Sequence, residues 1–462
     1  MIEGKTPYQK LVDYLERPVS IAPLVTFRIA FGLVMLFSTI RYMWMGWVDT
    51  QLVEPALHFS YFGFDWVAPL SQAGIYSIFC LMCIAAIGLA IGWQYRFSTI
   101  LFFLCFTYVE LIDITFYLNH YYFVSIVAFL LIWVPAHRNY SIDTFLKPHL
   151  RRTKVPAWCV GIFKLQIAIV YCYAGLAKIN YDWLFRALPL AIWLPAKSSM
   201  PLIGWFFQFK LTAFVFSWAG MLFDTFIIGG LLWRKTRLIA YAAIVIFHLL
   251  TGLLFQIGVF PAVMIMVVTV FFSAEWHERL LQKISQWIPF LAGSQNQTQK
   301  EPETSARVNH SHRLGLLLLG LFFTFQILFP WRYLLYPGNL FWTEEGYRFA
   351  WRVMLMEKAG TATFYVKDSE TGREGSVINQ QFLHPHQEKQ MAMQPDMILQ
   401  YAQFLKEHYA EKGVNDPQVR AEVWVTLNAR PAQLLIDPHT DLTQIKDGWS
   451  SKNWILPYPN QN

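Results

Sequence analysis

Long apolar segments alternate with short polar connections along most of the chain. Runs that reach or approach the length of a bilayer lie near residues 20–45, 73–93, 97–117, 121–135, 160–177, 211–232, 237–255, 257–272 and 313–330. Since a transmembrane helix needs about 20 apolar residues, this pattern predicts about nine crossings. The runs at 121–135 and 257–272 are short, so a tilted, broken or re-entrant segment there would change the number by one or two.

The pattern changes after the last apolar run. Alternating apolar residues, turn residues and one helical repeat predict a small α+β domain; the expected elements are strands at 361–367, 375–378, 419–427 and 433–437 and a helix at 397–410. The predicted organisation is a transmembrane catalytic bundle at 1–273, a cytoplasmic linker at 274–312, a last transmembrane helix at 313–330 and an outer domain at 331–462. The fold class is therefore a polytopic α-helical membrane protein with a C-terminal extramembrane α+β domain.

Composition supports the membrane assignment. Of the 462 residues, 55% are hydrophobic and only 15% are charged, which departs from a soluble globular protein. The net charge of +7 comes largely from basic residues in short loops, so it has a topological meaning and no nucleic-acid partner is predicted. The five cysteines lie in or beside apolar runs and are expected to be packing residues.

The distribution of charge predicts an orientation. The loop at 138–154 and the turn at 234–237 are basic, whereas the loop at 49–65 is acidic. Because cytoplasmic loops are enriched in Lys and Arg, the N-terminus is predicted to be cytoplasmic and the C-terminal domain to lie outside. For a bacterial protein this location is the inner membrane with a periplasmic domain, and for a eukaryotic one the domain is lumenal.

Four polar residues from different helices fall at one predicted level near the outer surface. Asn119 and His120 lie between the third and fourth crossings, Lys178 ends the fifth, and His248 lies in the outer half of the seventh. Taken singly, a lysine there is more often an interfacial anchor and a histidine more often a hydrogen-bonded helix contact. Ionisable groups at this depth are costly, so their convergence makes them candidates for a site.

Other catalytic or metal-binding patterns are weak. His384-Pro-His386 is the only close histidine pair, and its proline and outer-domain position favour a turn over a metal site. Trp351-Arg352 is compatible with anion binding, although a guanidinium stacked on aromatic neighbours is the simpler interpretation. No metal is predicted.

Several segments match the motifs of one family. Tyr171–Trp183, YCYAGLAKINYDW, resembles the active-site lysine segment of the vitamin K-dependent γ-glutamyl carboxylases and their bacterial relatives, the horizontally transferred transmembrane domain (HTTM) family. Tyr117–His120 resembles the Asn-His segment of that family. Further similar segments, in the later helices and the lumenal domain, are 247–260, 273–276, 424–430 and 436–438.

The resemblance implies an enzyme that couples oxygenation of reduced vitamin K to its epoxide with γ-carboxylation of protein glutamate. Oxygen and carbon dioxide would be co-substrates, and the partners would be a Glu-containing protein or peptide, membrane lipid and a quinone reductase for recycling. Lys178 would act as the base toward the quinol, and His120 would assist at the glutamate carbanion. The residues expected to bind substrate or quinol are Asn119, Tyr171, His248, Trp183, Arg352 and Arg430.

A lysine can accept a proton near neutral pH only where burial favours its neutral form. Lys178 is therefore predicted to be buried and largely unpaired, facing His120 across a cavity open to lipid and to the outer domain, with Asp182 turned elsewhere. Two departures from the vertebrate pattern are Ala177, where a second lysine is found, and Leu249–Gly252, which lacks amide side chains. Two alternatives remain: a quinol epoxidase without carboxylase activity, and a non-catalytic membrane binding or immunity-type protein.

Overall fold

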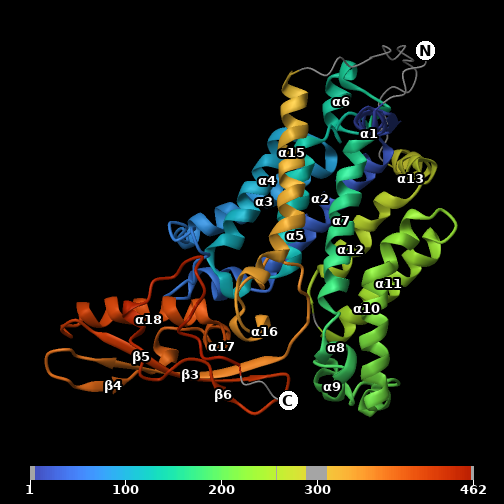
Figure 1. Cartoon of the computed structure of the whole chain (residues 1–462). Helices are drawn as coiled ribbons and strands as arrows, with labels where there is room; N and C mark the ends of the chain where they lie inside the picture. Colours follow the sequence, from blue (N-terminus) through green and yellow to red (C-terminus); the bar gives the residue numbers. More distant parts are fainter. Residues whose placement is uncertain (1–5, 256, 288–309, 459–462) are drawn as a thin grey trace.

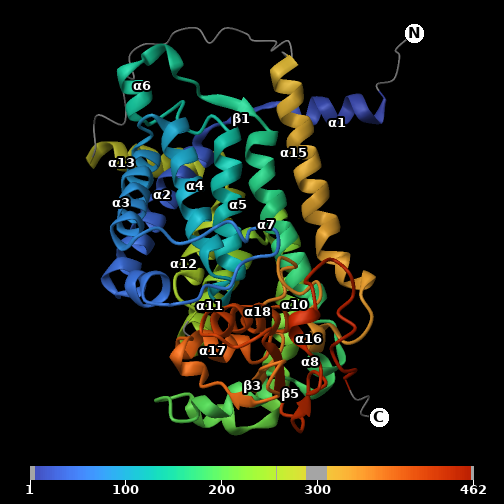
Figure 2. The same cartoon turned by 90° about the vertical axis from the view of Figure 1, so that its left-hand side faces the viewer.

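The computed structural model describes residues 6–255, 257–287 and 310–458 (Figure 1). Long apolar helices form a bundle, and the C-terminal domain lies at one end of it (Figures 1 and 2). The bundle helices are α2 (Ala22–Trp44), α3 (Gln72–Ile91), α4 (Tyr95–Ile112), α5 (Asn119–Trp133), α7 (Trp158–Ala177), α10 (Lys210–Leu232), α11 (Arg237–Phe255), α12 (Phe260–Val267) and α15 (His310–Leu328).

Seven helices within the described ranges are long and apolar enough to cross a membrane. An eighth crossing is possible where α12 and the 3-10 helix η6 (Val268–Phe271) bend by 118° into α13 (Ala274–Trp287). The predicted number of about nine is higher because it counts α5, which has only 15 residues. The predicted class of a multi-pass helical membrane protein with an α+β domain is confirmed.

Close helix contacts hold the bundle together. A Cβ on Gly32 of α2 would lie 2.7 Å from the Ala90 Cβ of α3, so only glycine permits this crossing. Arg28, also in α2, is fully buried and donates to the carbonyls of Ala136 and Tyr140 at 3.1 and 2.6 Å. These bonds satisfy a charge that would otherwise be costly inside the bundle, and they tie α2 to the basic loop.

Short elements cap the two ends. At the end away from the C-terminal domain lie α1 (Pro7–Glu16), α6 (Ile142–Leu146) and the antiparallel pair β1 (Pro18–Ser20) and β2 (Lys154–Pro156) (Figure 2). At the other end, α8 (Tyr181–Arg186) and α9 (Leu190–Trp193) follow α7. Part of the predicted linker is helical, since α13 covers 274–287; residues 288–309 of that linker lie outside the described residues.

The C-terminal domain is built on a four-stranded antiparallel sheet with the order β4-β3-β5-β6. Its elements are α16 (Leu340–Thr343), β3 (Lys358–Lys367), β4 (Glu374–Ser376), α17 (Pro385–Met391), α18 (Pro395–Glu411), β5 (Gln418–Leu427) and β6 (Gln433–Leu434). Alternate residues of β5, such as Val423 and Val425, are buried, and together with Phe364 of β3 they belong to one core with Tyr401 and Leu405 of α18. The strand periodicity thus places one face of the sheet against α18.

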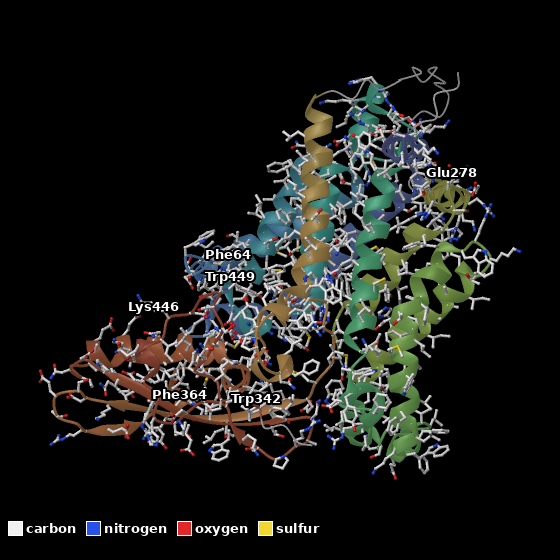
Figure 3. The ribbon with its side chains drawn as sticks, in the orientation of Figure 1. Phe64, Glu278, Trp342, Phe364, Lys446 and Trp449 are labelled. Carbon is white, nitrogen blue, oxygen red and sulfur yellow. The ribbon has the colours of Figure 1, made fainter. Side chains whose placement is uncertain are left out.

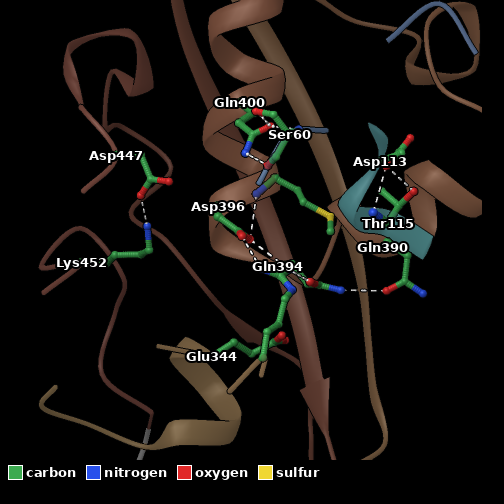
Figure 4. A network of polar contacts seen from close by, with 12 residues as sticks. Ser60, Asp113, Thr115, Glu344, Gln390, Gln394, Asp396, Gln400, Asp447 and Lys452 are labelled. Atoms are coloured by element: carbon green, nitrogen blue, oxygen red, sulfur yellow. Dashed lines mark hydrogen bonds and ion pairs between the residues drawn. The ribbon is translucent and has the colours of Figure 1, made fainter. Parts of the chain in front are cut away.

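Polar contacts dock this domain on the bundle. Gln400 of α18 exchanges two hydrogen bonds with the backbone of Ser60, at 2.9 and 3.0 Å (Figure 4). Gln387 of α17 donates to the Asp113 carboxylate at 2.7 Å. Phe64 and Trp449 mark the same junction in Figure 3. The domain therefore sits directly over the loops that lead into α3 and α5.

Candidate functional site

A small apolar cavity of about 100 Å³, here the lysine cavity, lies where α7, α10, α11 and α12 meet. Its lining is mainly aliphatic and aromatic, with a few polar groups directed inward. The polar or amphipathic side chains are Tyr171, Lys178, Trp183, Asp224, His248 and Thr251, and the phenylalanines are Phe216, Phe247, Phe255 and Phe260. Apolar walls with a few convergent polar groups are typical of sites for small organic ligands.

Lys178 terminates α7 and forms a buried ion pair. Its Nζ donates to Asp224 Oδ2 at 2.7 Å and to the Ala174 carbonyl at 3.3 Å. The two residues are only 6% and 5% exposed. The predicted burial of Lys178 is confirmed, but the prediction that it is largely unpaired is wrong, because Asp224 reaches it from α10.

The pair depends on a close approach of α7 and α10. A Cβ on Gly175 would lie 2.6 Å from Thr225 Oγ1, so glycine is required at this crossing. Trp183 covers the ammonium, with Nζ 5.3 Å from its ring centroid. The Trp183 indole in turn donates to the Ser217 carbonyl of α10 at 2.7 Å. The lysine is thus held by a carboxylate and faced by an aromatic ring.

Tyr171 and His248 form a second buried polar pair in the lysine cavity. The Tyr171 hydroxyl and His248 Nε2 are 2.9 Å apart. Within the described part of the chain, His248 Nδ1 is buried and has no hydrogen-bond partner. A buried polar atom without a partner is costly, so a ligand hydroxyl or carbonyl at this position would gain a hydrogen bond.

A larger cavity of about 760 Å³, here the polar cavity, lies between the C-terminal domain and the end of the bundle on which that domain docks. Its lining includes Asn119, His120 and Arg352. His120 is 8% exposed and makes no hydrogen bond with any residue that the structure describes. Its position at the start of α5 directs a titratable ring toward the domain interface.

The prediction that Lys178 faces His120 across a single cavity is wrong. The two residues line two adjoining cavities. The Phe260 ring lies between the two histidines of these cavities: its centroid is 5.4 Å from that of His120 and 5.3 Å from that of His248. Both cavities are lined by Phe255, Ile257, Phe260, Val353 and Met354. The partition arises because α12 begins between α5 and α11 and places an aromatic side chain there.

Asn119 holds the segment that carries Arg352. The Asn119 amide donates to the Arg352 carbonyl at 3.0 Å and accepts from the Tyr117 hydroxyl at 3.1 Å. The Arg352 guanidinium stacks over the Tyr333 ring at 4.4 Å, and burial lowers the pKa of Arg352. Asn119 therefore positions backbone, and Arg352 is stacked as the simpler interpretation predicted.

Cations outnumber acids in the polar cavity. Arg348 pairs with Asp396, and Lys358 Nζ donates to Glu344 Oε1 at 2.8 Å. Within the described ranges no carboxylate pairs with the remaining cations, which are Arg41, Arg352 and Lys389. The cavity can accordingly accommodate an acidic ligand.

Arg430 lies apart from both cavities. Its two terminal nitrogens donate to the Asp182 carboxylate at 2.7 and 2.6 Å, and Asn428 adds a third bond at 2.8 Å. Burial alone raises the pKa of the Asp182 carboxyl, but the bonds from Arg430 and Asn428 bring it below its usual range. Asp182 thus turns away from Lys178 as predicted, whereas Arg430, predicted to bind substrate or quinol, clamps the C-terminal domain to α8.

Asp224 was missed by the sequence analysis. It is the one acidic residue in the apolar run of α10, and an ionisable group inside such a run is itself a signal of function. Only Asp182 was considered as a partner for Lys178 because it lies four residues along the chain. The α7–α10 packing brings the distant carboxylate instead.

The part of the chain that the structure describes contains no group of three or more His, Cys, Asp or Glu residues arranged to hold a metal ion. His386 Nε2 lies 3.1 Å from the Thr115 carbonyl, and its ring stacks on Phe116 at 4.8 Å between centroids. His386 therefore contributes to docking of the C-terminal domain.

Two family models match the chain. The HTTM domain matches residues 16–276, and the lumenal domain of vitamin K-dependent gamma-carboxylase matches residues 311–461. The first covers the bundle up to α13 and the second covers α15 and the C-terminal domain. No solved structure matches the chain.

Proposed function

The chain belongs to the vitamin K-dependent gamma-carboxylase family, and we propose that it couples the oxygenation of reduced vitamin K to its epoxide with the γ-carboxylation of glutamate in a protein or peptide. One observation carries the proposal: a buried lysine in an apolar cavity adjoins a cation-rich cavity beneath the C-terminal domain. The two co-substrates of such a reaction, an apolar quinol and an acidic peptide, need sites of these two kinds.

The lysine cavity suits a hydroquinone ring. Aromatic side chains provide flat apolar walls, and the unpartnered His248 Nδ1 and the Tyr171 hydroxyl offer hydrogen bonds to ring oxygens. When bound, the hydroquinone supplies the reducing equivalents for the reaction with oxygen. Lys178 in its neutral form would take a proton from a ring hydroxyl, and Asp224 would stabilise the ammonium that results.

The polar cavity suits a glutamyl side chain and its flanking peptide. Arg41, Arg352 and Lys389 would attract and hold carboxylates. We assign His120 to the glutamate side of the reaction because it lines this cavity without a hydrogen bond to any described residue. The aromatic wall at Phe260 would limit the passage of water between the two sites.

The orientation is also a proposal. The basic loop around α6 and the C-terminal domain lie at opposite ends of the bundle (Figure 2), which supports a cytoplasmic N-terminus and an outer C-terminal domain. In a bacterium this would be the inner membrane, with the glutamyl substrate on the periplasmic side. A quinone reductase would be needed to regenerate the quinol.

The decisive experiment uses the full chain in lipid nanodiscs with reduced vitamin K, oxygen, ¹⁴C-bicarbonate and a Glu-containing peptide. Epoxide together with labelled peptide is expected, and Lys178→Met should abolish both. Epoxide without label would favour the quinol epoxidase for that peptide. Binding of the quinol without epoxide would favour the non-catalytic membrane protein.

A further inference from the structure

A third cavity, of about 230 Å³, lies at the end of the bundle remote from the site already described. It is enclosed by the end of α1, strand β1, the first half of α7 and the η6–α13 bend. The charged side chains lining it are Arg17 and Lys164, and the remaining lining residues are apolar, aromatic or small. We refer to it as the α1 cavity.

The positive charge of the α1 cavity is not balanced by its own lining. Its two charged lining residues, Arg17 and Lys164, are both cations. No carboxylate is among the described residues that line the cavity. The nearby Glu278 of α13, labelled in Figure 3, instead accepts a hydrogen bond from Ser20 at 2.8 Å. Clustered cations that lack a carboxylate favour an anionic ligand.

Aromatic rings help to fix both cations. The Arg17 guanidinium lies 4.1 Å from the centroid of the Tyr14 ring, and Lys164 Nζ lies 5.5 Å from that of Phe271. Each ring leaves the other N–H directions of its cation available for hydrogen bonds to a ligand. Phosphate oxygens are suited to such donors.

The helices around the α1 cavity have the features of interfacial helices. Figure 2 shows α1 projecting sideways from the bundle beside α15, transverse to the bundle helices, and α13 turns away from α12 and η6 by 118°. On α1, Tyr8, Leu11 and Tyr14 are 74%, 55% and 56% exposed. An amphipathic helix with large apolar residues exposed on such a surface is expected to rest at the boundary between headgroups and acyl chains.

We propose that the α1 cavity binds the phosphate of an anionic phospholipid headgroup, with the acyl chains in the adjacent bilayer. A free phosphate ion would share the chemistry of recognition by Arg17 and Lys164. The lipid is favoured because the exposed apolar face of α1 places the cavity at headgroup level. The site would fix α1 and the η6–α13 bend to the membrane surface.

The test uses the full chain in detergent, titrated with dioleoylphosphatidylglycerol or dioleoylphosphatidylcholine. Native mass spectrometry counts retained lipids, and thermal unfolding reports their effect on Tm. Wild-type protein should retain phosphatidylglycerol in preference to phosphatidylcholine and gain stability from it. Arg17→Gln and Lys164→Gln should each weaken the phosphatidylglycerol affinity roughly fivefold, since each removes one cation near the membrane surface.

Lys235→Gln is the matched control, because Lys235 is an exposed cation in the α10–α11 turn and does not line the cavity. It should leave the affinity unchanged. Equal retention of both lipids by the unmodified protein would overturn the proposal, whether or not the variants fold. Equal weakening by Lys235→Gln, or a Tm gain reproduced by inorganic phosphate alone at millimolar concentration, would also overturn it.

Discussion

Replacing Asp224 with Asn tests whether the buried carboxylate supports the proposed proton transfer to Lys178. The substitution keeps the size of the side chain and an oxygen that accepts a hydrogen bond, but removes the negative charge. In the wild-type protein the Asp224 carboxylate lies 2.7 Å from Nζ, where it would stabilise the ammonium that forms when Lys178 accepts a proton. In the variant a neutral amide takes its place, so this stabilisation is lost.

The size of the effect follows from the geometry. At 2.7 Å and an effective dielectric of about 20, the attraction lost is about 6 kcal/mol. The retained amide hydrogen bond and the relief of burying the carboxylate offset part of this loss. A net loss of about 1.4–4 kcal/mol of stabilisation of the ammonium corresponds to a roughly tenfold to several-hundredfold fall in rate.

The assay is the initial rate of vitamin K epoxide formation in nanodiscs between pH 6 and 10. The rate should fall at least about tenfold in Asp224→Asn because the ammonium formed on proton transfer loses its stabilising carboxylate. Asp182→Asn, which removes a carboxylate not paired with Lys178, should leave the rate within about twofold of wild type.

A double variant separates stability from chemistry. Asp224→Asn leaves a buried charge without its partner, which destabilises by up to about 3–5 kcal/mol, whereas Lys178→Met/Asp224→Leu removes both charges and should recover most of that stability. It should form no epoxide. The reasoning is refuted if Asp224→Asn keeps the wild-type rate, or if the double variant is less stable than Asp224→Asn.

Three further outcomes are expected. Asp182→Asn should destabilise the protein by about 1–3 kcal/mol at pH 7. Because the folded-state pKa of Asp182 is depressed, the difference in Tm between variant and wild type should shrink as the pH falls below about 4. A Tm difference that stays constant with pH would exclude the Arg430–Asp182 clamp as the cause of the destabilisation. His120→Ala should reduce ¹⁴C incorporation more than epoxide formation, and an equal loss of both would contradict its assignment to the glutamate side. Phe260→Ala should raise the amount of epoxide formed per carboxylation by opening the wall between the cavities; an unchanged ratio measured with both assays would show that this ring does not separate them.

Periodicity determined the architecture. Long apolar runs can satisfy the hydrogen bonds of their backbone groups in a bilayer only as helices. The alternation of apolar and polar residues at 361–367 and 419–427 places the apolar side chains on one face only if these segments are strands. The sequence therefore predicted the bundle, the sheet and the C-terminal α+β domain. The number of crossings depends on α5, whose 15 residues are apolar but short, and the sequence did not predict the helix at 274–287 within the expected linker.

The candidate residues were found by chemistry, but their partners were not. Lys178, His248 and Tyr171 were selected from sequence, and the structure brings them to one cavity. Asp224 lies 46 positions from Lys178, and Arg430 lies 248 positions from Asp182. No local pattern connects residues so far apart along the chain.

The sequence by itself determined which groups are ionisable, which segments are apolar and hence which lysine stands at the end of an apolar helix. Only the tertiary structure decided that this lysine is paired with Asp224, that Phe260 stands between His120 and His248, and that Arg430 serves as a clamp. The physical reason is that the hydropathy of a segment is a local property, whereas the pairing of side chains depends on helix crossings such as that of Gly175 against Thr225. At such a crossing, a difference of a few tenths of an ångström in the distance between the helices decides which side chains meet.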